Sequence, residues 1–72
     1  MDPTATWESL LAALEHGDGE EAREYARSLL SWLARGGFWT VKGVSRTEAR
    51  AICRLCQDGR GCAAAWQRVV LT

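Results

Sequence analysis

The sequence has no hydrophobic run of the length that crosses a membrane, which takes about 18 apolar residues. Its first residues, MDPTATWESLL, also lack the basic start and the unbroken apolar stretch of a secretory signal. The three cysteines are an odd number, which does not suit a framework of disulfides. We therefore expect a protein of the reducing cytoplasm that does not act on a membrane.

The chain also lacks an excess of either charge, because it has nine basic and nine acidic side chains. The charges are nevertheless unevenly placed. Residues 1–40 carry seven acidic and three basic side chains, whereas residues 41–72 carry six basic and two acidic ones. Such asymmetry is typical of an anion-binding half, or of two halves that complement each other.

Apolar residues recur with helical spacing in four segments, at about 6–16, 19–35, 46–57 and 62–71. The last segment contains WQRVVL, whose residue types also suit a strand, but the helical period fits it better. Between the second and third segments lies FWTVKGV, residues 38–44, which we interpret as an extended aromatic linker laid over the core. The sequence therefore predicts an all-α fold without a sheet.

The 72 residues are enough for one small domain. We divide it into an acidic helical hairpin at 1–37, the linker at 38–44 and a basic helical hairpin at 45–72. The prediction is thus a small bundle of two helix hairpins, with about four short helices. A core of this size supplies only a few kcal/mol of net stability, so binding to a partner is a natural supplement.

All three cysteines fall in one stretch, CRLCQDGRGC, residues 53–62. A zinc site needs four ligands, and Cys53, Cys56 and Cys62 supply only three. The single histidine, His16, is predicted on the polar side of the first helix. We therefore interpret the cysteines as small apolar side chains in a core corner, with DGRG as the turn, and expect no metal or other cofactor. A zinc site at these three cysteines remains the alternative.

Catalytic patterns are absent from the sequence. A redox C-x-x-C needs its first cysteine at the start of a helix that follows a strand, but Cys53 lies well inside the third predicted helix. The carboxylates cluster where helices start, which capping explains, and the glycines do not form a phosphate loop. We expect that the protein is not an enzyme.

A basic stripe is the strongest sign of a nucleic-acid partner. Lys42, Arg46, Arg50 and Arg54 have the spacing to line one side of a helix start, and Trp39 could stack on a base. An arginine ladder with this spacing is also an ordinary solvated face, which could pair with the acidic second helix. A small nucleic-acid-binding regulator is therefore the alternative function.

Four tryptophans are many for so short a chain and favour a protein-interaction module or accessory subunit. Trp7 and Trp66 are expected to fill the core. Trp39 in the linker and Trp32 at the edge of the second helix are the candidate partner contacts. The partner is expected to be another protein or a second copy of this chain, bound through a tryptophan-rich helical surface.

Overall fold

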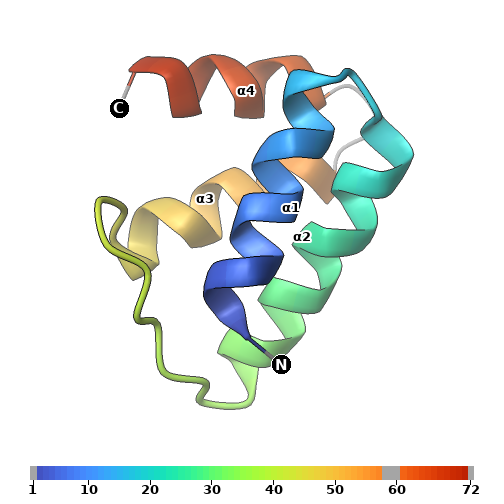
Figure 1. Cartoon of the computed structure of the whole chain (residues 1–72). Helices are drawn as coiled ribbons and strands as arrows, with labels where there is room; N and C mark the ends of the chain where they lie inside the picture. The colour runs from blue at the N-terminus through green and yellow to red at the C-terminus, as the bar shows by residue number, and fades with distance from the viewer. Residues whose placement is uncertain (1, 58–60, 72) are drawn as a thin grey trace.

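Four α-helices make up most of the computed structural model (Figure 1). They are α1 (Pro3–Glu15), α2 (Gly19–Ala34), α3 (Arg46–Gln57) and α4 (Gly61–Leu71). The structure describes residues 2–57 and the backbone of residues 61–71, with side chains from Ala63 to Leu71. No strand occurs among these residues, so the all-α prediction is confirmed, and the ambiguous segment at 62–71 is a helix.

Side-chain caps decide where three of the helices begin. Asp2 Oδ1 accepts a hydrogen bond from Thr4 N at 3.0 Å, so α1 starts at Pro3, three residues before its predicted start. Asp18 Oδ1 accepts from Glu21 N at 3.1 Å, and Ser45 Oγ accepts from Glu48 N at 3.1 Å. Each oxygen satisfies an N–H that the first helical turn leaves without a partner.

Glycines end α2 and turn the chain into a loop at residues 35–45. Gly36 has a φ of +83°, a conformation that glycine adopts without steric cost. Its neighbour Gly37 lies directly against Trp32, because a Cβ added there would collide with the indole ring. The pair therefore allows the loop to leave the helix while Trp32 covers its start.

The helices pack in the order of the chain, α1 on α2, α2 on α3 and α3 on α4, and α4 returns to contact α1. Figure 1 shows α1 and α2 side by side in opposite directions, with α4 across one end of the pair and the loop along one side. One cluster of buried side chains joins all four helices. Its largest fully buried members are Leu10, Leu29, Ile52, Cys53 and Cys56.

The sequence also predicts a turn at DGRG and no membrane-spanning segment. The predicted turn at 58–61 lies mostly outside the described residues. Among those that are described, no helix combines the length and the apolar character that crossing a membrane requires.

Candidate interaction sites

Two tryptophans hold the loop against the helices. The Trp7 and Trp39 rings meet edge to face, with centroids 5.6 Å apart and an interplanar angle of 87°. Trp39 Nε1 also donates a 2.9 Å hydrogen bond to Val44 O, within the loop. The indole of Trp39 is thereby fixed at both its edge and its N–H, so the loop has a defined position over the core.

The predicted partner contacts, Trp32 and Trp39, are both half-buried. Trp32 covers Gly37, and Trp39 packs on the core cluster, so each offers only part of its ring to solvent. The large apolar side chains that the structure leaves most exposed are Phe38 at 79%, Val70 at 64% and Leu71 at 80%. Partner binding through Trp32 and Trp39 stays a prediction, and the most exposed large apolar side chains lie in the loop and at the end of α4.

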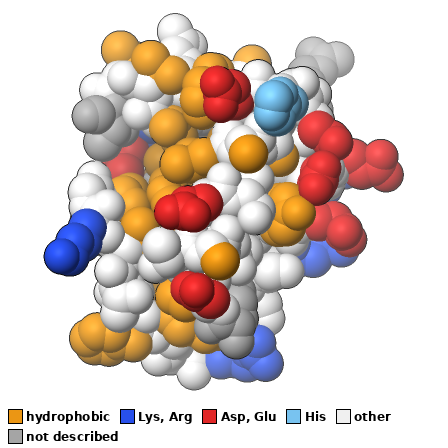
Figure 2. All heavy atoms as spheres, in the orientation of Figure 1, with side chains coloured by type: hydrophobic (Ala, Val, Ile, Leu, Met, Phe, Trp, Pro, Cys, Tyr) orange, Lys and Arg blue, Asp and Glu red, His pale blue; other side chains and the backbone are white. Residues whose placement is uncertain are grey.

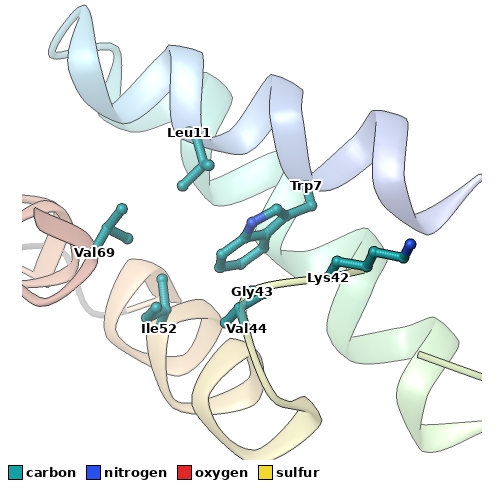
Figure 3. A pocket seen from close by; sticks show the side chains of 7 residues that line it. All are labelled: Trp7, Leu11, Lys42, Gly43, Val44, Ile52 and Val69. Carbon is teal, nitrogen blue, oxygen red and sulfur yellow. The ribbon is translucent and has the colours of Figure 1, made fainter. Parts of the chain in front are cut away.

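A hydrophobic depression opens between three helices and the loop. It has a volume of about 230 Å³ and is lined by Trp7, Leu11, Lys42, Gly43, Val44, Ile52 and Val69. In Figure 3 the apolar side chains point toward one another from α1, α3, α4 and the loop, while the Lys42 ammonium points away from them. Figure 2 shows hydrophobic side chains gathered over this region. We call these seven residues the apolar groove.

The apolar groove continues along α1. A second open depression shares Trp7, Leu11 and Lys42 with it and is also lined by Thr4, Glu8, Thr40 and Val41. The two together follow the seam between α1 and the loop. Lys42 therefore stands between two depressions, where its charge can meet a group that lies in either one.

The predicted basic stripe is divided by the fold. Lys42 belongs to the apolar groove, and Arg46 Nη2 donates a 3.1 Å hydrogen bond to Leu33 O in the last turn of α2. Arg50 and Arg54 are exposed on α3. Among the described residues, none of the three stripe arginines forms an ion pair with the acidic start of α2. The structure therefore places Lys42 apart and leaves the Arg50 and Arg54 charges unpaired in that part of the chain.

One ion pair joins α3 to α4. Arg68 Nε donates to Glu48 Oε1 at 2.6 Å, and Arg68 Nη2 donates to Glu48 Oε2 at 3.2 Å. These hydrogen bonds lower the pKa of Glu48 and raise that of Arg68. At the start of α3, Ser45 caps the helix while the Glu48 carboxylate binds Arg68.

Cys53 and Cys56 are fully buried in the core, as core packing requires. Burial, followed by the effect of the neighbouring Cys56, raises the pKa of the Cys53 thiol to about 12. Such a thiol is protonated and inaccessible at neutral pH, which is the opposite of a redox-active cysteine. No group of three or more possible metal ligands occurs among the described residues. Cys62 lies outside the described side chains, and His16 is exposed at the end of α1.

Comparisons with models of known protein families, with curated proteins and with solved structures find no match to this chain. What the apolar groove and the basic surface bind is therefore inferred from the residues that form them.

The sequence did not indicate Leu11, Val44 or Val69 as wall residues of a site. Leu11 and Val69 belong to the apolar arcs of their helices, and an apolar arc alone does not separate a core position from a groove wall. The one signal was Lys42, a lone lysine between apolar residues in VKGV.

Proposed function

We propose that this protein is a small non-catalytic interaction module that binds a short segment of another protein in the apolar groove. The observation that carries the proposal is a depression walled by large apolar side chains from three helices, with one charged group at its edge. Its about 230 Å³ exceeds the roughly 150 Å³ cavity that holds benzene and is smaller than the roughly 300 Å³ at which small-molecule sites begin. This size suits one large apolar side chain of a partner.

Lys42, at the edge of the apolar groove, indicates which segments of a partner protein can bind there. A carboxylate on the bound segment, a few residues from the apolar anchor, can reach the Lys42 ammonium at the edge of the groove. The exposed Val70 and Leu71 follow groove residue Val69 at the end of α4 but lie outside the groove. The segment is thus expected to combine a large apolar residue with a nearby Asp or Glu.

We favour another protein over a second copy of this chain. Among the described residues, the exposed large apolar side chains are Phe38, Val70 and Leu71, and no Asp or Glu lies within five residues of any of them in the sequence. None therefore brings a carboxylate to Lys42. We further propose a cytoplasmic location, because Cys53 is a free thiol.

Selection from a displayed peptide library tests the proposal without a known partner. We expect peptides with an apolar anchor and an acidic neighbour, and Val69→Asn is expected to weaken their binding about tenfold. Val70→Asn is the matched control, because it removes the same apolar group just outside the groove and should bind almost as wild type. Circular dichroism of both variants verifies the fold.

Three results would contradict the proposal. Selected peptides without a large apolar residue would remove the anchor, and equal losses in the two variants would place binding outside the groove. A dimer in light scattering that Val69→Asn dissociates would show that a second copy occupies the groove instead.

A further inference from the structure

A second surface lies on the other flank of α3, where it packs against α2. Two hydrogen bonds fix the register of this antiparallel pair: Gln57 Nε2 donates to Arg23 O at 3.0 Å, and Arg46 Nη2 donates to Leu33 O at 3.1 Å. Position 23 therefore lies level with position 57, and position 33 lies level with position 46. The residues between these ends face one another in order along the pair.

Arginines occupy this flank on both helices. Residues four apart in a helix lie on the same side, so Arg27 follows Arg23 on α2, and Arg50 and Arg54 follow Arg46 on α3. The register then orders four of these arginines along the groove as Arg23, Arg54, Arg27 and Arg50, so that they alternate between the two helices. At a rise of about 1.5 Å per residue, successive arginines in this order are about 2–5 Å apart along the helix axis. We call these four residues the arginine groove.

The charges of the arginine groove are not neutralised within the described residues. The ion pair recorded there joins Arg68 to Glu48, on the opposite flank of α3. The segment from residue 25 to residue 47 contains no Asp or Glu, so no acidic side chain follows Arg27 in α2 or in the loop. The Nε of Arg23 is buried and has no acceptor among the described residues, and Arg23 takes no part in the ion pair found there.

Acidic groups do border one end. An open depression at the start of α2 is lined by Asp18, Glu20, Glu21, Arg23, Glu24 and Arg27. The four acidic side chains weaken the positive potential at Arg23 and Arg27, so it is strongest at Arg50 and Arg54 on α3. The exposed large hydrophobic residues are Phe38, Val70 and Leu71, and none belongs to either flank that forms the groove.

We propose that the arginine groove binds the phosphate backbone of a nucleic acid without reading its bases. A double row of guanidinium groups suits a polyanion with a regular repeat, and each fork can donate two hydrogen bonds to one phosphate. A protein partner would instead need apolar anchors at the centre of the interface, which this face lacks. The groove acts independently of the apolar groove, because the two lie on different flanks of α3.

Fluorescence anisotropy with mixed-sequence single-stranded DNA, single-stranded RNA and duplex DNA of equal length tests the proposal across a range of salt concentrations. If four arginines contact phosphates, the logarithm of the binding constant for duplex falls with the logarithm of salt with a slope of about −3.6, from about −0.9 per contact. The three probes show which nucleic acid carries the phosphates. A polyglutamate peptide of the same length is the acidic-protein probe.

Matched variants locate the contact. Arg54→Gln is expected to weaken binding and to reduce the slope by about 1, whereas the double change of Arg50 and Arg54 reduces it by about 2. Arg35→Gln is the control, because Arg35 shares a depression with Arg27 but lies past the last turn of α2 and is not one of the four groove arginines. Replacing Glu20 and Glu24 with glutamine is expected to tighten binding. Thermal unfolding of each variant verifies that the fold is retained.

The proposal fails in any of three cases. No binding of any nucleic acid at low salt would remove it, because phosphate contacts are strongest there. An equal loss in Arg35→Gln and Arg54→Gln would show attraction by general charge rather than by the groove. Polyglutamate bound as tightly as nucleic acid would assign the face to an acidic protein.

Discussion

Helix α3 borders two grooves of opposite character. On one flank Ile52 meets α1, α4 and the loop, and the surface is apolar with a single lysine at its edge. On the other flank, where Arg46 and Gln57 bond to α2, the exposed residues of α3 include Arg50 and Arg54. Between the flanks the helix buries Ala49, Cys53 and Cys56 in the core.

The two grooves differ in how they depend on the fold. The walls of the apolar groove include core residues, since Trp7 and Ile52 are 5% and 1% exposed. In the arginine groove, by contrast, Arg27, Arg50 and Arg54 are exposed and only Arg23 is half-buried. A change in the first should therefore alter stability and binding together, whereas a change in the second should alter binding alone.

The largest expected effect is that of Trp7→Ala, which removes a buried ring from the apolar groove. Loss of a buried tryptophan costs about 3–5 kcal/mol, which is close to the whole stability of a domain of this size. We expect a largely unfolded protein in urea titrations followed by circular dichroism. Leu30→Ala, at a half-buried position of α2, is the control and should lose less. Equal stability of Trp7→Ala and wild type would show that the groove is separate from the core.

The next change, Trp39→Phe, tests what holds the loop over the apolar groove. Phenylalanine keeps an aromatic ring near Trp7 but cannot donate to Val44 O, so one hydrogen bond is lost. We expect the free energy of unfolding to fall by about 1 kcal/mol. Amide hydrogen exchange should become faster in the loop while the centre of α2 is unaffected. Unchanged exchange in the loop would mean that the ring contact alone positions it.

Cys53, on the buried face of α3 between the two grooves, makes the free energy of unfolding depend on pH. The unfolded chain loses the Cys53 proton near the ordinary pKa of 9.0, whereas the folded protein keeps it to about 12. The unfolded state then binds fewer protons, so the contribution of Cys53 to stability should be constant below about pH 9 and fall as the pH rises toward 12. Urea midpoints across this range measure it, and Cys53→Ala should reduce the slope. Tyr25, whose pKa its hydrogen bond to Glu21 raises, remains in both proteins as a common background.

The smallest effect concerns the Glu48–Arg68 pair that joins α4 to α3. The pKa of Glu48 is lowered in the folded state, so its contribution is present above the usual carboxylate pKa and is lost as the pH falls through the folded value. We expect Glu48→Gln to lower the thermal midpoint slightly at pH 7 and to leave it unchanged in acid. A difference that persists in acid would mean that the carboxylate acts through packing rather than charge.

Much of the fold could be predicted because local chemistry decides it. Asp18 and Ser45 mark the starts of α2 and α3, and the glycines that follow Arg35 mark the end of α2. Either Asp2 or Thr6 could cap the start of α1, because both are good capping residues, and the bonds that form select Asp2.

The grooves were harder to predict, since each depends on a register between distant segments. Arg27 and Arg54 are far apart in the sequence, and only the contacts of Gln57 and Arg46 with α2 place them on one surface. The nucleic-acid prediction grouped Lys42 with Arg46 by spacing along the chain. The loop, held by Trp39, carries Lys42 to the other flank of α3.

The order in which the helices pack has a consequence for folding. Each helix contacts the next one along the chain, and α4 also returns to contact α1. A contact between neighbouring helices closes a shorter stretch of chain than the return of α4 to α1, so it costs less chain entropy to form. We therefore expect the contact of α4 with α1, which brings Val69 to the same groove as Leu11, to form last when the protein folds.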